Sequence, residues 1–360
     1  MNNQTFRGVQ ALRGIAALSV MLFHFRWNIN AVSPGIGDRL FGWGATGVDL
    51  FFLISGFVIT LSATRSEEGI NGSLNFLKKR ALRILPTYYI ILIITFFLSG
   101  AMSTFHYADK TENFISSLAF IPIYPEHGPF YVDDNGMYGI RWTLNYEVLF
   151  YILMSISLLF SKRLLSAFLL FSMTLIVLPL AIFGGLTLNP AGYNTASPYI
   201  GLITNPMVWL FIAGAAIGLL APHLQWLSGR LMACVALISI AMTGYLFNKG
   251  QYVGHGLLSS GWLYAIILFS VVLSERFIGR FVPNSLIKLG DISFSLYLIH
   301  TLMNGGIGKR FESLGIEDGY MRLMVSVILS LLLSWLSYRY IEGLFLDKRK
   351  KAEVAVSSRN

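Results

Sequence analysis

Ten long stretches of this chain are almost purely apolar, and each is close to the length of a helix that crosses a bilayer. Such a helix needs about 20 residues, because each residue adds about 1.5 Å. The stretches run over residues 9–28, 46–64, 84–100, 142–160, 164–185, 204–221, 231–248, 257–274, 289–307 and 323–341. They predict an all-α membrane protein with about ten transmembrane helices, since helices satisfy their own backbone hydrogen bonds in lipid.

Charged residues are scarce in this chain. Asp, Glu, Lys and Arg make up 12% of its 360 residues, against about 25% in soluble domains. The mean hydropathy is +0.63. These values exclude an ordinary soluble enzyme and a disordered regulator, because neither is built from so little polar surface. The single cysteine, Cys234, excludes an intramolecular disulfide and a metal site with several cysteines.

The basic residues of the loops predict the orientation. With both termini placed in the cytoplasm, 19 of the 27 Lys and Arg residues fall on the cytoplasmic side and 8 on the outer side, as the positive-inside rule requires. The net charge of +9 is then a signature of topology and calls for no nucleic acid. We expect one membrane domain over 1–346 and a short charged cytoplasmic tail over 347–360. The long outer connection, 101–141, is expected to cover part of an outward-facing site.

A few charged or titratable side chains lie in or beside the apolar stretches, where a charge costs about 2.5–3.5 kcal/mol on insertion scales. They are Arg13, His24, Asp49, Glu147, Asp291, His300 and Glu342. Arg13 and His24 share one face of the first span, because eleven residues make about three helical turns. Asp49 and Glu147 are expected at the depth of His24. The spacing therefore predicts a titratable site formed by three spans.

Two chemistries fit an imidazole beside a carboxylate in this place. The pair His24 and Glu147 fits general base catalysis, in which the carboxylate fixes the tautomer and stabilises the imidazolium. The same pair fits a proton relay in a transporter. The structural alternative is that His24 is a packed polar residue bonded to a neighbouring helix. The periodicity leaves these alternatives open.

Two further polar patterns stand out. Arg80 and Arg83 lie on one face of a basic cluster at 78–83 that opens the third expected span, and such a junction suits phosphates; contact with anionic lipid is the alternative. Ser293, Tyr297 and His300 form one helical stripe, which indicates either a site or ordinary hydrogen bonding between helices. No two histidines have the spacing of metal ligands, so we expect no metal.

Six blocks of the sequence resemble the acyltransferase-3 family of membrane proteins. They are residues 11–18 around Arg13 with His24 beyond them, 47–57 with Asp49 and Ser55, 80–89 with the Arg-x-x-Arg pattern, 142–151 opening on Trp142 and containing Glu147, 292–300, and 340–342. The resemblance runs from residue 6 to about 346. Thr143 stands where the family usually has Ser, and Gly343 where Pro often follows the late Glu.

The resemblance implies transfer of an acyl group, most often acetyl, from cytosolic acyl-CoA to a hydroxyl of a carbohydrate that is outside the membrane or linked to lipid. It implies the bacterial cytoplasmic membrane as location. It also implies acyl-CoA, a carbohydrate acceptor and membrane lipid as partners, with a homo-oligomer or glycan-assembly proteins as additional ones. A proton-coupled transporter or flippase and an enzyme that uses succinyl-CoA are the alternative interpretations.

The resemblance also implies roles for single residues. Arg80 and Arg83, with Arg13, would hold the phosphates of CoA at the inner face. His24, supported by Glu147, would act at the thioester, either by deprotonating the acceptor or by carrying the acyl group itself. The remaining polar positions are expected either to touch the substrate or to hold helices together; they are Asp49, Ser55, Trp142, Ser293, Tyr297 and His300.

Overall fold

The structure is a computed structural model that describes residues 6–100, 103–133 and 138–345. In these ranges its regular elements are all helices. The α-helices are α1 (Arg7–Val32), α2 (Ile36–Phe41), α3 (Gly47–Ala63), α4 (Gly69–Thr95), α5 (Ala108–Ala119), α6 (Arg141–Ser157), α7 (Arg163–Ser172), α8 (Leu178–Phe183), α9 (Pro198–Thr204), α10 (Val208–Leu220), α11 (Gly229–Asn248), α12 (Trp262–Ile278), α13 (Asn284–Asp291), α14 (Ser293–Ile299) and α15 (Tyr320–Ser337). The expected tail at 347–360 lies outside the described residues.

The expectation of an all-α membrane protein is confirmed, with a difference in the number of spans. Within the described ranges, eight helical segments are long and apolar enough to cross a membrane. The pair formed by α13 and the segment Ser293–Arg310, bent by 56°, makes a ninth if it counts as one span. The remaining expected span, 142–160, corresponds to α6, whose 17 residues are fewer than the roughly 20 that a full crossing needs.

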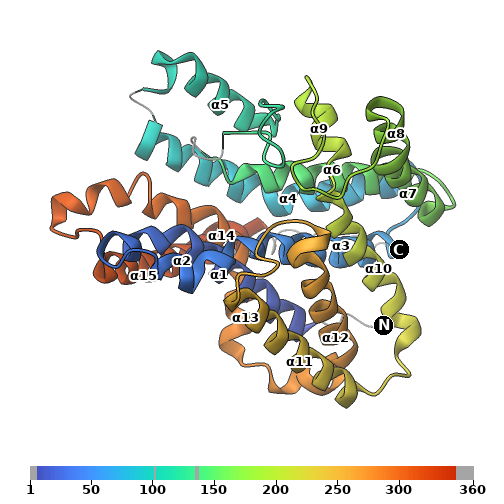
Figure 1. Cartoon of the computed structure of the whole chain (residues 1–360). Helices are drawn as coiled ribbons and strands as arrows, with labels where there is room; N and C mark the ends of the chain where they lie inside the picture. Colours follow the sequence, from blue (N-terminus) through green and yellow to red (C-terminus); the bar gives the residue numbers. More distant parts are fainter. Residues whose placement is uncertain (1–5, 101–102, 134–137, 346–360) are drawn as a thin grey trace.

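The short helix α6 begins inside the protein. Its first residue, Arg141, has no exposed surface. The Arg141 guanidinium donates to Ser116 Oγ at 2.8 Å and to Asn113 Oδ1 at 3.3 Å, and both acceptors lie on α5. The helix α5 rests in turn on α4, because Tyr88 and Tyr89 donate their hydroxyls to its last carbonyls (Figure 1). The connection 103–133 therefore covers the start of α6.

The helices α1 and α3 run through the centre of the molecule. The helix α1 packs against α3, α12, α13, α14 and α15, and Figure 1 shows it beside α14 and α15. The helix α3 packs against α10 so closely that a Cβ on Gly56 would lie 2.0 Å from Phe211 O. A Cβ on Gly214 would lie 1.9 Å from Leu53 O. Glycine at both positions is what allows the two backbones to touch.

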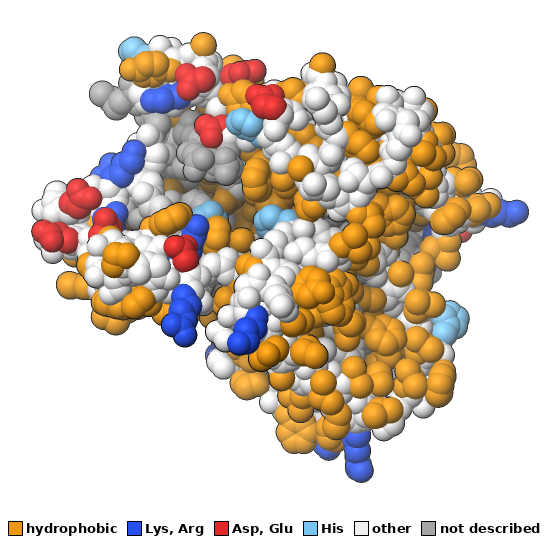
Figure 2. Space-filling view, viewed as in Figure 1, with side chains coloured by type: hydrophobic (Ala, Val, Ile, Leu, Met, Phe, Trp, Pro, Cys, Tyr) orange, Lys and Arg blue, Asp and Glu red, His pale blue; other side chains and the backbone are white. Residues whose placement is uncertain are grey.

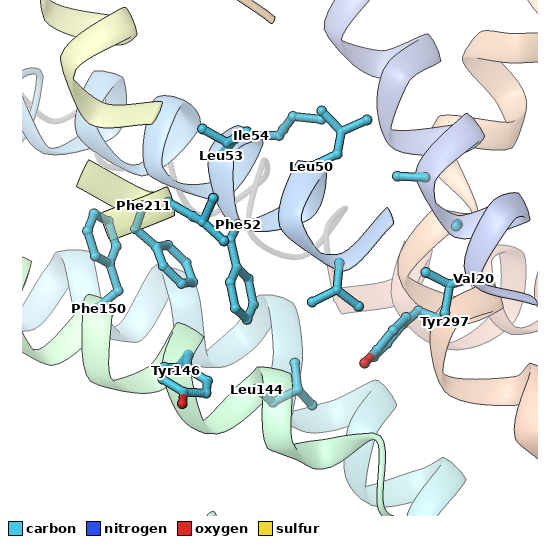
Figure 3. Close-up of a cluster of buried hydrophobic side chains, with 14 of the residues drawn as sticks. Val20, Leu50, Phe52, Leu53, Ile54, Leu144, Tyr146, Phe150, Phe211 and Tyr297 are labelled. Atoms are coloured by element: carbon cyan, nitrogen blue, oxygen red, sulfur yellow. The ribbon is translucent and has the colours of Figure 1, made fainter. Parts of the chain in front are cut away.

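Aromatic side chains fill the space where α3, α6 and α10 meet (Figure 3). The ring of Phe211 stacks on Phe52 and on Phe150, with centroids 4.5 Å and 4.9 Å apart. Tyr146 packs against Phe52 on the other side. Figure 3 shows Tyr297 across from this cluster, at the side of α1 that carries Val20.

The outer surface is apolar over a large area. Figure 2 shows hydrophobic side chains over most of the right and lower parts of the face in view, whereas most of the charged side chains lie on its left and upper left. Phe168 on α7, Ile238 on α11 and Ile328 on α15 are each more than 60% exposed. A soluble protein rarely exposes so much apolar surface, whereas hydrocarbon tails cover it in a membrane.

Candidate active site

A small cavity lies between the central helices at the level of Arg13, and we call it the arginine cavity. Arg13 of α1, Arg83 of α4 and Glu147 of α6 bring charge to its lining. The lining is completed by Val48, Phe51, Phe52, Ile54, Ser55, Ile84, Thr143, Leu144, Ser293, Phe294 and Tyr297. Its volume of about 70 Å³ is about half that of a cavity of about 150 Å³ that holds benzene. The space therefore suits a group as small as acetyl and not a nucleotide.

The two arginines of this cavity are not neutralised by ion pairs. Arg13 donates to Gln10 Oε1 at 3.3 Å, and Gln10 donates to Asp291 Oδ1 at 2.7 Å. Asp291, a charge that the sequence leaves unexplained, thus positions Gln10, and Gln10 in turn positions Arg13. Neither Arg13 nor Arg83 forms an ion pair with a carboxylate in the described part of the chain. Their charge is available to an anionic or strongly polar ligand.

Glu147 is held by hydroxyl groups. Its Oε1 accepts from Tyr151 OH at 2.5 Å and from Ser55 Oγ at 3.3 Å. The guanidinium of Arg80 lies over the ring of Tyr151, 5.9 Å from its centroid, and over that of Phe76 at 5.4 Å. Arg80 is not part of the cavity lining. Of the two arginines predicted at the basic cluster, the structure brings only Arg83 into this cavity.

The basic cluster also lies elsewhere on its helix than expected. The helix α4 begins at Gly69, well before residue 84, so residues 78–83 sit in its interior and not at a loop–helix junction. The backbone N–H groups at these positions are used by the helix itself. The prediction of a loop–helix junction with free backbone amides at residues 78–83 is therefore wrong, and only the side chains of this cluster are left to bind a ligand.

Two more predicted residues face the same region. Ser293 is fully buried and lines the arginine cavity, and its Oγ has no hydrogen-bond partner within the described ranges. Glu342 is also buried and accepts from Ser295 Oγ at 3.2 Å. A buried hydroxyl without a partner is costly. Ser293 is thus a candidate donor or acceptor for a ligand in the arginine cavity.

A larger polar cavity lies at the His24 end of α1, and we call it the histidine cavity. Its volume is about 550 Å³. It is lined by His24, Thr95, Ser99, Ser103, Thr104, Asp109, Lys110, Asn113, Asp133, Tyr138, Gly139, Ile140, Thr301, Leu302, Asn304, Gly305, Gly306 and Lys309. Residues 103–133 supply one wall, in line with the expected partial cover. Hydroxyl, amide and charged groups of both signs suit a polar, many-hydroxyl ligand.

A hydrogen-bonded pair of side chains stands between the two cavities. Tyr297 OH lies 2.8 Å from Thr143 Oγ1 and donates to Ile140 O at 3.1 Å. Tyr297 and Thr143 line the arginine cavity, whereas Ile140 lines the histidine cavity. The pair therefore forms part of the wall that separates them.

His24 lies beside His300 and not beside Glu147. The His24 and His300 rings are 4.9 Å apart, and the ring of Tyr297 is 5.8 Å from that of His300. His300 Nδ1 lies 3.1 Å from Leu296 O, so this nitrogen carries the hydrogen. His300 Nε2 is then an acceptor, buried and without a partner in the described part of the chain.

The expected pairing of His24 with Glu147 is therefore corrected: the two line different cavities. The depth argument assumed that α6 starts at the membrane surface. Because Arg141 is instead buried beneath α5, Glu147 lies deeper than its place in the sequence indicates.

Asp49 belongs to a third group of residues. Its carboxylate is fully buried and has three partners at 2.7 Å, namely His255 Nδ1, Gly256 N and Ser260 Oγ. Trp142 packs against the His255 ring, with centroids 5.7 Å apart. Sequence reasoning assigned nothing to His255, and no local pattern could have found it, because 206 positions separate it from Asp49.

These features define a multi-pass helical membrane protein with a cationic cavity and a histidine-lined polar cavity, and Tyr297 and Thr143 form part of the wall between them. Residues 6–339 match the family model described as an acyltransferase domain, acyltransferase 3, and the chain belongs to this family of acyltransferases. The resemblance carried by the six sequence blocks is thereby confirmed.

Curated relatives extend the comparison. The chain is 30% identical over 298 residues to the exopolysaccharide production protein ExoZ of Rhizobium meliloti (strain 1021), with 80% of this chain and 84% of that protein covered. It is 26% identical over 319 residues to nodulation protein 10 of Rhizobium leguminosarum bv. viciae, with 81% of each covered. It is 24% identical over 392 aligned residues to a protein of Staphylococcus aureus (strain COL) named provisionally as an O-acetyltransferase, covering 96% of this chain but 58% of that protein. No solved structure matches the chain.

Proposed function

We propose that this protein transfers an acyl group, acetyl in the first instance, from acyl-CoA to a hydroxyl of a carbohydrate on the far side of the bacterial cytoplasmic membrane. The observation that carries the proposal is the pair of unlike cavities that meet at Tyr297 and Thr143. The family supports acyl transfer, and the name of the relative from Rhizobium meliloti supports a polysaccharide as acceptor.

The distribution of basic residues supports a side of the membrane for each cavity. Under the positive-inside rule the Arg13 end faces the cytoplasm, where acyl-CoA is made. An anionic nucleotide is drawn to that side, and Arg13 and Arg83 hold the acyl end of the donor. The small volume of the arginine cavity favours acetyl over succinyl or longer groups. The acceptor enters the histidine cavity from outside.

In the proposed reaction His24 is the general base. It takes the proton of an acceptor hydroxyl, and the oxygen attacks the carbonyl carbon of the thioester. The C–S bond then breaks, and the sulfur takes the proton from the imidazolium to give free CoA and an ester. Arg13 and Arg83 stabilise the negative charge that develops on the carbonyl oxygen. Tyr297 must move aside, because it stands between the two cavities.

His300 takes the supporting place that Glu147 was expected to hold. Its free Nε2 accepts the N–H of His24 when the two rings turn towards each other, which leaves the second nitrogen of His24 ready to take a proton. Glu147, fixed by Tyr151 and Ser55, lies in the other cavity with the two arginines.

Transfer of labelled acetyl from acetyl-CoA to glycan in membranes tests the proposal. We expect wild-type membranes to label the glycan and His24→Gln membranes to label it about 10²–10⁴-fold more slowly. Succinyl-CoA serves as the second donor, and mass spectrometry of the product separates the two added groups. Undiminished transfer by a well-folded His24→Gln protein would falsify the catalytic role. Transport that depends on a proton gradient and needs no acyl-CoA would support the transporter instead.

A further inference from the structure

Three hydrogen-bonding partners fix the carboxylate of Asp49. One oxygen accepts from Gly256 N and Ser260 Oγ, and the other lies 2.7 Å from His255 Nδ1. The side chain has no exposed surface. Because both oxygens have partners, the carboxylate is held in one orientation. The group on which it acts most directly is the imidazole of His255.

The contact with Asp49 decides which nitrogen of His255 is free. Since a carboxylate only accepts, Nδ1 must carry the hydrogen, and Nε2 is the nitrogen that accepts a further hydrogen bond when the ring is neutral. No described residue bonds Nε2, and the side chain is 18% exposed. The arrangement holds this acceptor in one orientation on a partly exposed side chain.

The backbone and side chains around His255 restrict its position. The next residue, Gly256, has a φ of +98°, which favours glycine, and a Cβ on it would lie 2.7 Å from Pro190 Cγ. The connections α8–α9 and α11–α12 therefore meet at this point, and both lie outside under the predicted orientation. On the protein side the ring packs against Trp142.

His255 is linked through α6 to the wall between the cavities. Trp142 contacts His255, and the next residue, Thr143, contacts the hydroxyl of Tyr297. The first turn of α6 thus touches the Asp49–His255 pair on one side and the proposed path of the acyl group on the other.

We propose that His255, oriented by Asp49, is a binding residue for a hydroxyl of the carbohydrate acceptor at a sugar unit beyond the one that reacts. The proposal rests on the proposed acyl transfer to a carbohydrate. A fixed acceptor nitrogen suits a saccharide, whose hydroxyls donate, and it lies on the side from which the acceptor comes. The subsite lies apart from the lining of both cavities, so it contributes to affinity and not to the chemical step.

Two variants separate binding of glycan by His255 from anchoring of its loop to Asp49. His255→Asn keeps a donor in the place of Nδ1, so the loop stays tied to Asp49, but it removes Nε2. Ser260→Ala is the matched control, because it removes another donor to the same carboxylate and leaves the imidazole in place. Gln reaches the place of Nε2 and restores a polar atom there. His255→Gln is therefore the rescue variant.

The measurement is acetyl transfer by the full-length protein in proteoliposomes. The acceptor is the surface glycan of the cells that carry the gene, freed of esters by mild base. We expect His255→Asn to raise the apparent KM for glycan about 3–10-fold, the effect of one lost hydrogen bond. The kcat and the KM for acetyl-CoA should stay unchanged. Ser260→Ala should stay within about twofold of wild type, and His255→Gln should recover part of the loss.

Two results would overturn the subsite. One is a KM for glycan in His255→Asn that equals the wild-type value. The other is a KM for glycan that rises as much in Ser260→Ala as in His255→Asn, because His255 would then only anchor its loop to Asp49. Direct binding of the same glycan, followed by tryptophan fluorescence, decides the question without turnover. If the wild type binds glycan and transfers nothing, the proposed function fails while the comparison of His255→Asn with wild type still tests the subsite.

Discussion

The ring centroids of His24 and His300 lie 4.9 Å apart, and the two ring planes are tilted by 47°. The Nδ1 hydrogen of His300 is donated to Leu296 O. This relationship leaves His300 Nε2 as the acceptor proposed for His24, a place that Glu147, which lines the other cavity, does not occupy. It also places the pair directly beside Tyr297, at the wall between the two cavities.

The role of His300 as a positioning residue can be tested by His300→Asn. Asn keeps a donor to Leu296 O but lacks an atom in the place of Nε2. We expect kcat to fall about 5–30-fold with the KM for acetyl-CoA unchanged, because the hydrogen bond proposed to hold the tautomer of His24 can no longer form. His300→Gln, which restores a polar atom near Nε2, should recover part of kcat. A His300→Asn enzyme with wild-type kcat would show that His300 only packs.

Arg83 and Arg80 make a matched pair for donor binding. Arg83 lines the arginine cavity, whereas Arg80 stacks on Phe76 and Tyr151 outside it. We expect Arg83→Ala to raise the KM for acetyl-CoA about 10–100-fold, as loss of a charge-assisted hydrogen bond does. Arg80→Ala should raise the KM for acetyl-CoA less than Arg83→Ala does. Binding of acetyl-CoA measured by isothermal titration in detergent checks both, and equal losses would contradict the distinction between them.

We expect a weaker wall between the two cavities to let water reach the donor thioester. Tyr297→Phe removes the hydroxyl that bonds Thr143 and Ile140. One hydrogen bond contributes about 0.5–1.5 kcal/mol, so we expect acetyl-CoA hydrolysis without acceptor to rise severalfold as water reaches the thioester. Thr143→Ser keeps the hydroxyl and should behave as wild type. Release of free CoA in the absence of glycan is the measurement, and an unchanged rate in Tyr297→Phe would contradict a sealing role.

The contact of α3 with α10 predicts a stability effect. In Gly56→Ala the new Cβ would lie 2.0 Å from Phe211 O, so the backbones must separate. We expect a loss of about 1–3 kcal/mol in the free energy of unfolding, typical of overpacking. Gly244→Ala on α11 is the control, since nothing lies within 4 Å of its Cβ, and it should be neutral or slightly stabilising. Thermal unfolding in detergent compares the two, and equal midpoints would contradict the close contact.

Much of the architecture follows from the sequence alone. Apolar runs of about 20 residues have few structures open to them in lipid, because every backbone group must be satisfied within its own helix. The scarcity of charge makes Arg13, His24 and Glu147 visible as exceptions. The spacing of Ser293, Tyr297 and His300 places them on one stripe, and Ser293 and Tyr297 do face the arginine cavity.

Only the tertiary structure decides which of these side chains meet. It separates His24 from Glu147, because α6 starts beneath α5 and not at the membrane surface. It leaves Arg80 outside the lining to which Arg83 belongs, and it joins Asp49 to His255 across 206 positions. Periodicity fixes the face of a helix on which a residue lies, but the neighbour of that face depends on how helices are rotated and on where loops fold back. Those depend on packing across the whole chain, which no local spacing encodes.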